Sequence, residues 1–553
     1  MKLSAVSTLL LGAANCINFA LVSSHYPPPV GKLDIVQLPA QKAQTISNRR
    51  LSASSVDHER SIIESFERDF ADVLRTNGVP GMTYAVVRAN QTIAASGIGV
   101  ADVTKPHSTV DADTLFMVGS VSKSMTAALL ATLVDDGTLL FTSRIGDVLP
   151  LFRLKDPLAS AQCTLEDAML HRTGLPRHDG LLEVMKGQPP DAFFHKIKHL
   201  EPSTEFRSTF EYTNLMWATV GHAAAAAVDS LNMTFEDAIQ ERIFDAIGMR
   251  NAVPRPNLLR PGISKPSAGH YVKLADTRAN DTTVAYDGYN DAGFGAPAAM
   301  VMASANDMAV YMRTLLNKGL TPNGDRVLST ETVDALFRGR IPTDAMRGAF
   351  PTPYFTEEQK YGYGWFNSVY RGKHRIVHHG GAWDGFLTLV ALFPDEDLAI
   401  AASVNMQHDF TANAAVLDLA DRFFGYRDVD WALSFGKLVD DMRDEKRKKP
   451  NYDRNKQISR PLEAYVGRYE HKGYAVAEVG LIKQSSDSVP RLSVKLGHVE
   501  DVLQHAEYDT FVTIVDSQPI NFTFFSPNAS KSMQKINIQL EPSIPEVIFT
   551  RIN

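Results

Sequence analysis

A run rich in alanine, leucine and methionine over residues 122–136 predicts a helix that stops at Gly137. The tetrad Ser120-Val121-Ser122-Lys123 stands at the start of this helix. Residues three apart in a helix share a face, so the side chains of Ser120 and Lys123 are expected to meet. The first turn of the helix also presents unpaired backbone N–H groups and the positive end of the helix dipole to the serine. The fold is therefore predicted to hold a hydroxyl and an amine together at a helix start.

The Ser-x-x-Lys pattern alone is weak support for chemistry. Two further copies occur, neither of which opens a comparable helical run: Ser434-Phe435-Gly436-Lys437 and Ser532-Met533-Gln534-Lys535. A serine hydroxyl becomes a good nucleophile when a base takes its proton, and a lysine can serve when burial lowers its pKa. The plainer interpretation makes Ser120 a helix N-cap and Lys123 a solvated lysine.

Two later motifs favour the chemical interpretation. In Tyr212-Thr213-Asn214, the tyrosine can deliver a proton to a leaving group and later help to activate a water molecule, and Asn214 can bind Lys123 and a substrate carbonyl. In His379-Gly380-Gly381-Ala382, the two glycines let a strand backbone approach the substrate closely. We expect an oxyanion hole made of the backbone N–H groups of Ser120 and Ala382. Taken singly, either motif would be read as an ordinary aromatic residue or turn.

The three motifs together resemble those of the serine beta-lactamase and penicillin-recognising enzyme superfamily, which uses SxxK, YxN and KTG or HxG. The YxN form is similar to the branch with class C beta-lactamases, D-alanyl-D-alanine carboxypeptidases, D-aminopeptidases and related esterases. The resemblance spans residues 60–425 and extends to five further segments, at 79–82, 114–119, 171–176, 246–249 and 361–365. It implies an α/β/α three-layer fold, in which helices flank an antiparallel sheet and a helical subdomain carries Tyr212.

The resemblance also implies an activity. His379 stands where a beta-lactamase usually has a lysine, and a mostly neutral histidine is a poor anchor for a substrate carboxylate. We therefore expect hydrolysis of a small ester, an amide or a short peptide through an acyl-enzyme on Ser120, rather than hydrolysis of antibiotics. Two alternatives remain open: transfer of the same acyl group to an alcohol or amine, and a non-catalytic protein that uses the cleft for binding. No metal or cofactor is expected, since GxSxG, HExxH, CxxC and phosphate-loop motifs do not occur.

The chain divides into segments of different character. A first helix is predicted over 61–76, followed by a hairpin with strands at 82–88 and 92–95. Short alternating runs after residue 460 predict a small all-β domain, and residues 461–470 resemble the start of the lipocalin-like barrels attached to some of these enzymes. The expected division is a signal peptide (1–24), a linker or pro-segment (25–58), the catalytic domain (59–430), a charged linker (431–459) and the β domain (460–553).

The N-terminal residues predict secretion. Lys2 precedes an apolar run at 3–14, and Asn15 and Asn18 interrupt this run before it could span a bilayer. After cleavage Cys163 would be the one remaining cysteine, which predicts a packed free thiol. Candidate glycosylation sites for a secreted protein are Asn90, Asn232, Asn280, Asn521 and Asn528.

The charge of the chain bears on its partners. The formal net charge of −7 is spread along the 553 residues, and no basic stripe with interleaved aromatic residues occurs. Nucleic acid is therefore not an expected partner, and a small-molecule or short-peptide substrate fits better. The sequence does not indicate an oligomeric state.

Overall fold

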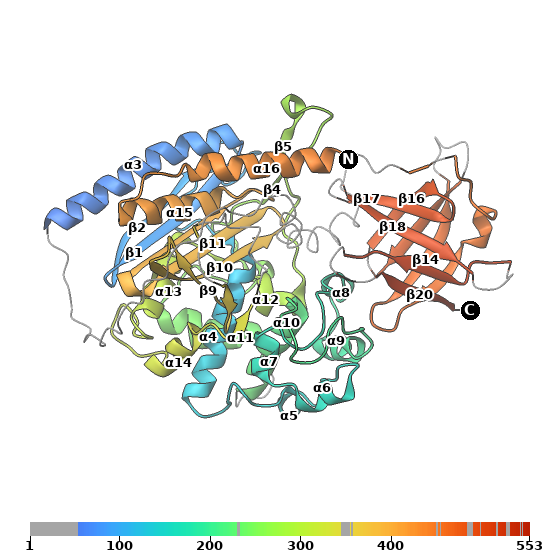
Figure 1. Ribbon diagram of the computed structural model, residues 1–553, viewed down its shortest axis with the longest axis horizontal. Helices are drawn as coiled ribbons and strands as arrows, with labels where there is room; N and C mark the ends of the chain where they lie inside the picture. The colour runs from blue at the N-terminus through green and yellow to red at the C-terminus, as the bar shows by residue number, and fades with distance from the viewer. Residues whose placement is uncertain are drawn as a thin grey trace, which may run out of the picture.

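The computed structural model contains a main domain, which ends with helix α16, and a C-terminal barrel (Figure 1). It describes residues 53–552 except 229–232, 344–353, 356–357, 449–451, 454, 484–489, 498, 516–517, 527–530, 542–543 and 545. The predicted signal peptide and most of the predicted linker or pro-segment (25–58) lie outside the described residues. The described part of that segment, from Ala53 onward, already belongs to the first helix.

An antiparallel sheet forms the centre of the main domain. Its central strands are runs of mostly apolar residues, as in Phe386–Phe393, and every residue of that strand is buried because helices cover both faces of the sheet. Among the described residues the sheet has eight strands, in the order β2 (Gln91–Gly99), β1 (Gly81–Arg88), β12 (Leu398–Val404), β11 (Phe386–Phe393), β10 (His374–Trp383), β9 (Phe366–Tyr370), β8 (Lys360–Tyr361) and β7 (Ile341–Pro342).

Helices cover both faces of this sheet, which confirms the expected three layers (Figure 1). Three helices from the two ends of the domain lie on one face: α3 (Ala53–Asn77), α15 (Thr411–Phe424) and α16 (Trp431–Arg447). On the other face lie α13 (Ala305–Leu316), α14 (Thr330–Leu336) and the buried α4 (Ser122–Asp135). Helix α4 begins and ends within one residue of its predicted bounds.

A helical subdomain packs beside α4. Its helices are α5 (Ile145–Val148), α6 (Pro157–Gln162), α7 (Leu165–Met169), α8 (Gly180–Val184), α9 (Pro190–Ile197), α10 (Asn214–Ala227) and α11 (Phe235–Ile239). The short α12 (Ala296–Ala299) packs against both α4 and α10. Two small two-stranded sheets complete the domain, β3 (Phe116–Met117) with β6 (Met302–Ala303), and β4 (His270–Lys273) with β5 (Thr282–Ala285). The Tyr212 motif leads directly into α10, as the resemblance implied.

The C-terminal domain is a closed antiparallel barrel, as expected. Alternate residues point inward, for example Leu492, Val494 and Leu496. Its strands are β13 (Gly467–Glu470), β14 (Val476–Ile482), β15 (Arg491–Leu496), β16 (Val499–Glu507), β17 (Thr510–Val515), β18 (Gln518–Phe525), β19 (Lys535–Ile538) and β20 (Val547–Ile552).

Residues 431–459 were expected to form a charged linker, but in the structure this segment begins with a helix. Its first part is helix α16, whose residues Trp431, Phe435 and Val439 are buried against the main domain. The polar residues that suggested a linker lie largely on the exposed side, where Asp440 and Asp444 pair with Arg278. The composition reflected an amphipathic helix rather than a flexible connection.

Two of the five candidate glycosylation sites are exposed in the structure. Asn90 lies in the β1–β2 turn and Asn280 in a short 3₁₀ turn, and both side chains are exposed. Asn521 lies on β18, where its Oδ1 accepts a hydrogen bond from Tyr452, while Asn232 and Asn528 lie outside the described residues.

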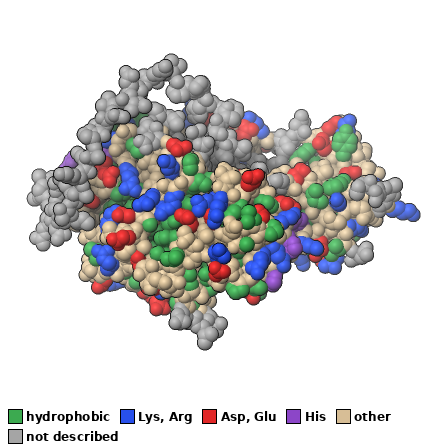
Figure 2. Space-filling model, turned by 60° about the horizontal axis from the view of Figure 1, so that its bottom comes forward, with side chains coloured by type: hydrophobic (Ala, Val, Ile, Leu, Met, Phe, Trp, Pro, Cys, Tyr) green, Lys and Arg blue, Asp and Glu red, His purple; other side chains and the backbone are tan. Residues whose placement is uncertain are grey.

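Lys/Arg and Asp/Glu side chains are intermixed on the face shown in Figure 2. No helix in the described ranges combines the length and the apolar character needed to cross a bilayer.

Cys163 is buried and unpaired, as predicted. Burial raises the pKa of its thiol, which disfavours the reactive thiolate.

Candidate active site

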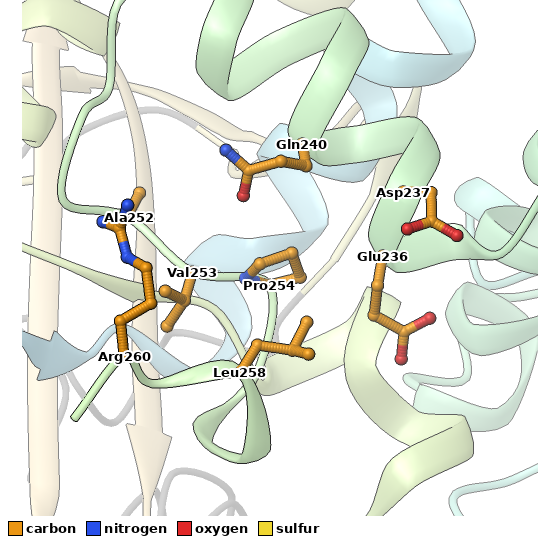
Figure 3. A pocket seen from close by; sticks show the side chains of 8 residues that line it. All are labelled: Glu236, Asp237, Gln240, Ala252, Val253, Pro254, Leu258 and Arg260. Atoms are coloured by element: carbon orange, nitrogen blue, oxygen red, sulfur yellow. The ribbon is translucent and has the colours of Figure 1, made fainter. Parts of the chain in front are cut away.

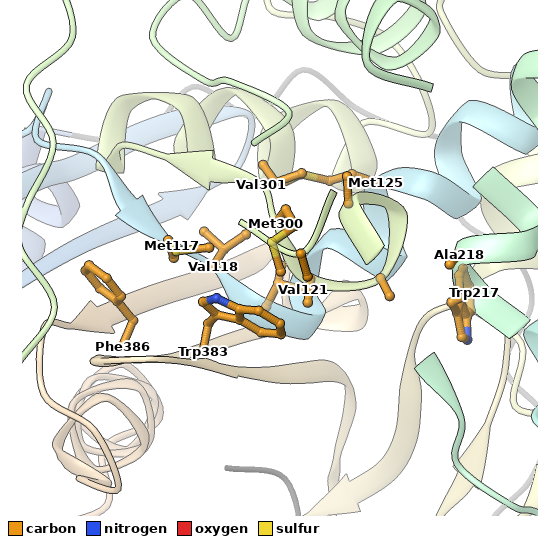
Figure 4. Packing of buried hydrophobic residues seen from close by; sticks show 14 of the residues in the cluster. Met117, Val118, Val121, Met125, Trp217, Ala218, Met300, Val301, Trp383 and Phe386 are labelled. Carbon is orange, nitrogen blue, oxygen red and sulfur yellow. The ribbon is translucent and has the colours of Figure 1, made fainter. Parts of the chain in front are cut away.

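Ser120 lies in a single 3₁₀ turn, Gly119–Val121, that leads directly into α4. Its neighbours Val118 and Val121 are fully buried, so the turn is fixed by packing on both sides. Figure 4 shows these two valines beside Met300 and Trp383, from three different parts of the chain. The serine itself keeps 5% of its surface exposed. The hydrophobic core therefore holds the hydroxyl in one place at the start of α4.

The amine of Lys123 meets the hydroxyl of Ser120, as the helical spacing predicts. Lys123 is fully buried, and its Nζ lies 3.0 Å from Ser120 Oγ. The same nitrogen donates to Asn214 Oδ1 at 2.6 Å and to the Ala298 carbonyl at 2.9 Å. Both of these partners only accept hydrogen bonds. A neutral amine has two N–H groups and one lone pair, so its two donors would face these acceptors and its lone pair would face the Ser120 hydroxyl.

The amide of Asn214 has a fixed orientation. Its Nδ2 donates to Asp179 Oδ2 at 2.9 Å, and a carboxylate can only accept. The amide oxygen must therefore point to Lys123. Arg177 donates to the same Asp179 oxygen through Nε at 3.0 Å and also through Nη2. Asp179 thus orients Asn214, and Arg177 holds Asp179.

Neither Arg177 nor Asp179 was among the residues predicted from the sequence. Both follow directly after the segment 171–176, which already resembled the superfamily. A charged pair so close to a recognised segment was the available signal.

The ring of Tyr212 lies close to two basic side chains. Lys123 Nζ is 4.9 Å from the ring centroid, and the Arg177 guanidinium carbon is 5.2 Å from it. The ring stacks on His171, with 4.3 Å between the ring centroids. His171 in turn accepts the backbone N–H of Thr213 at 2.9 Å, which fixes the motif at the start of α10. The structure therefore brings Tyr212, Asn214 and Lys123 together although they are far apart in the chain.

The two glycines of the third motif differ in their surroundings. A Cβ on Gly381 would lie 1.9 Å from the Val118 carbonyl oxygen and 2.9 Å from the Ser120 nitrogen. A Cβ on Gly119 would lie 2.4 Å from the Ala382 nitrogen. At Gly380 the nearest contact, to the Thr388 carbonyl, would be an ordinary 3.7 Å. Strand β10 thus touches the Ser120 turn backbone to backbone, which brings the nitrogens of Ser120 and Ala382 close to each other.

His379 is buried and neutral. Its Nδ1 lies 2.5 Å from the Gly380 carbonyl, which only accepts, so Nδ1 carries the proton. Nε2 is then left to accept from the Tyr361 hydroxyl at 3.2 Å. Burial, assisted by the nearby Lys123, lowers the pKa of His379 to about 3. The residue supplies no fixed positive charge to the site.

A separate polar pocket lies beside α11. It has a volume of about 190 Å³ and is lined by residues that include Glu236, Gln240 and Arg260 (Figure 3). Burial raises the pKa of Glu236. None of the three motifs contributes a residue to this pocket, so it is distinct from the Ser120 site.

The fold and the arrangement of the three motifs define a protein of the serine beta-lactamase and penicillin-recognising class. The chain belongs to the beta-lactamase family, since the family model described as "Beta-lactamase" matches residues 66–422. A second model, described as "Domain of unknown function (DUF3471)", matches residues 453–549, the region of the barrel.

Individual relatives are distant. The chain is 26% identical to "Unguisins hydrolase ungD" of Aspergillus violaceofuscus, over 77% of this chain and 78% of that protein. It is 27% identical to "Penicillin-binding protein 4" of Amycolatopsis lactamdurans, over 60% of this chain and 83% of that one. The solved structure of an octameric penicillin-binding protein homologue from Pyrococcus abyssi is similar in fold, with a TM-score of 0.55 at 16% identity, covering 88% of this chain and all of that one.

Proposed function

We propose that this protein hydrolyses a small ester, an amide or a short peptide through an acyl-enzyme on Ser120. The observation that carries the proposal is the environment of the Lys123 amine. Two acceptors occupy two of its directions and the third faces Ser120 Oγ at 3.0 Å. The side chain is fully buried and its Nζ is held against Ser120 Oγ, so Lys123 is placed to act as the base.

Acylation starts with attack of Ser120 Oγ on the substrate carbonyl carbon. The hydroxyl proton passes to Lys123 Nζ as the Oγ–C bond forms. The carbonyl oxygen becomes an oxyanion, which the backbone N–H groups of Ser120 and Ala382 stabilise by about 3 kcal/mol each. Gly119 and Gly381 are needed for this arrangement because a side chain at either position would push the two backbones apart.

Collapse of the tetrahedral intermediate breaks the bond to the leaving amine or alcohol. The leaving group takes up the proton from the Lys123 ammonium, relayed by the Tyr212 hydroxyl. A water molecule then attacks the acyl-enzyme, its proton returns along the same route, and Ser120 Oγ leaves with a proton. Asn214 contributes by holding the Lys123 amine and by offering its amide to the substrate carbonyl.

The neutral state of His379 supports esters and amides over substrates that need a carboxylate anchor. The similarity to a protein named a hydrolase supports water as the final acceptor. Acyl transfer to an alcohol or amine would use the same acyl-enzyme. Product analysis with one acyl donor, with and without added alcohols and amines, separates the two reactions.

The proposal can be tested with a fluorophosphonate probe, which modifies activated serines. Wild-type protein is expected to take up one label per chain, on Ser120, and S120A none. The chain offers a matched control in S434A, which alters the second Ser-x-x-Lys copy on α16, where the serine hydroxyl donates to the Asp430 carbonyl at 2.8 Å. S434A should label like the wild type. An active wild-type protein that takes up no label on Ser120 would refute the mechanism.

We also infer that the protein is secreted and glycosylated. The apolar residues 3–14 and the exposed sequon residues Asn90 and Asn280 support this. Secretion from a eukaryotic host should yield protein whose mobility changes after treatment with an N-glycosidase. N90Q and N280Q should each remove part of that change, and no change in the wild type would contradict the inference.

A further inference from the structure

The barrel contacts the main domain next to the catalytic residues. The connection between β19 and β20 carries Glu541, which is fully buried and accepts the backbone N–H of Gly180 through Oε1 at 2.9 Å. In the same contact, the Tyr474 hydroxyl lies 2.7 Å from His178 Nδ1. Residues 178–180 directly follow Arg177 in the chain and include Asp179. The barrel therefore holds the loop that orients Asn214.

Glu541 and Asp179 form a buried pair of carboxyl groups. Each has one oxygen engaged, since Glu541 Oε1 binds Gly180 and Asp179 Oδ2 binds Asn214 and Arg177. The other oxygens, Glu541 Oε2 and Asp179 Oδ1, are buried and have no hydrogen-bond partner in the described part of the chain. The negative charge of Asp179 disfavours a second negative charge on Glu541.

These contacts form a continuous series from the barrel to the nucleophile. Glu541 faces Asp179, Asp179 orients the Asn214 amide, the amide oxygen binds Lys123, and Lys123 meets Ser120. Every side chain in the series has at most 6% of its surface exposed. Water can therefore do little to screen a change of charge at Glu541 from the rest of the site.

We propose that Glu541 is a positioning residue of the active site, which acts through Asp179 and Asn214 on the Lys123 amine, so that the barrel completes the catalytic apparatus. The inference rests on the hydrolytic function proposed above. Glu541 does not touch the reacting atoms. Its role is to set the charge and orientation of the groups that hold the base.

The charge on Glu541 gives this role a pH dependence. Burial, followed by the nearby Asp179, raises the pKa of Glu541 to about 8. Below that pH the Glu541 carboxyl is neutral. Above it, Glu541 is a carboxylate, and the added negative charge favours a proton on the Lys123 amine and so opposes its action as a base.

The other titratable groups in this contact do not change charge in the same range. Burial lowers the pKa of His178 to about 4, lowers that of His471 from its ordinary value, and raises that of Tyr474 well above its ordinary range. Arg177 stays positive throughout. A fall in activity near pH 8 that depends on this contact would therefore be due to Glu541.

The test is the pH dependence of Ser120 labelling and of kcat, measured from pH 6 to 10 in the full-length protein. The wild type is expected to lose about fivefold in rate between pH 8 and pH 9, and about tenfold between pH 9 and pH 10, because one ionisation inactivates the site. E541Q keeps the shape of the side chain but cannot ionise, and should change by less than about twofold over the same range. E541D keeps an ionisable group, so its rate should still fall as the pH rises, but at a pH different from that of the wild type.

Y474F is the matched control. It removes the other hydrogen bond between the barrel and the same loop without altering a carboxyl group, and should keep the wild-type pH profile. The proposal is wrong if E541Q and the wild type share one pH profile, or if Y474F flattens the profile as E541Q does, since the effect would then come from barrel docking alone. If E541Q does not fold, the E541D profile decides, because an unshifted fall would overturn the proposal. Absence of Ser120 labelling in the wild type at every pH would instead refute the proposed function.

Discussion

Alanine substitution at Gly381 and at Gly380 should have very different effects, although the residues are adjacent on β10. At Gly381 the added Cβ would lie 1.9 Å from the Val118 carbonyl oxygen, and real Cβ contacts below 3.0 Å essentially do not occur. The strand and the Ser120 turn must therefore separate by more than about 1 Å. At Gly380 the same methyl group would meet the Thr388 carbonyl oxygen at 3.7 Å, an ordinary contact.

The separation in G381A moves the Ala382 N–H relative to the Ser120 N–H. Misplacement by about 1 Å, or loss of one oxyanion donor, lowers the rate roughly 100-fold or more. We expect kcat/KM for a p-nitrophenyl ester to fall by at least about 100-fold in G381A and by less than about threefold in G380A. Thermal unfolding of both variants tests whether each is folded at the assay temperature. A folded G381A with activity within threefold of the wild type would refute the role of this backbone contact.

Three further predictions follow from the contacts of the base. D179N should lower kcat roughly 10- to 100-fold with little change in KM, because an amide no longer fixes the orientation of Asn214; an unchanged kcat would contradict this. K123A should lose at least about 10³-fold in kcat, whereas K437A, in the second Ser-x-x-Lys copy, should not differ from the wild type. The pKa of Glu541 in the folded protein, about 8, lies above its ordinary value of 4.5. Its contribution to the free energy of unfolding is therefore fully present below pH 4.5 and is lost as the pH rises to 8. The free energy of unfolding in urea should fall less between pH 5 and pH 8 in E541Q than in the wild type, by up to about 1.4 kcal/mol per pH unit, and equal falls would contradict the raised pKa of Glu541.

Local features of the fold were predictable from the sequence. Helix α4 matches its predicted range to within one residue because its composition and Gly137 define it locally. The β1–β2 hairpin was likewise recognisable, and Ala89 and Asn90 adopt the positive φ that such a tight turn requires. Helix α16 was missed because its charged residues dominate the composition, while the apolar residues that bury it are widely spaced.

The candidate site was predictable to the extent that it is made of short motifs. Ser120 and Lys123 are near in sequence, and the resemblance supplied Tyr212, Asn214 and the third motif. Asp179 follows the recognised segment 171–176 but belongs to none of the three motifs, and Glu541 carries no sequence signal, because their roles depend on which loops the fold brings together. Glu541 lies in the barrel, so only the docking of the two domains places it beside Asp179.

The most direct test of the account is to trap the acyl-enzyme itself. Wild-type protein mixed with a slowly hydrolysed ester and quenched in acid should gain the mass of one acyl group per chain, and peptide mapping should place it on Ser120. Lys123 and the oxyanion hole would then be acting on the predicted nucleophile. An acyl group on another residue, or turnover of the same ester by S120A at the wild-type rate, would contradict the account.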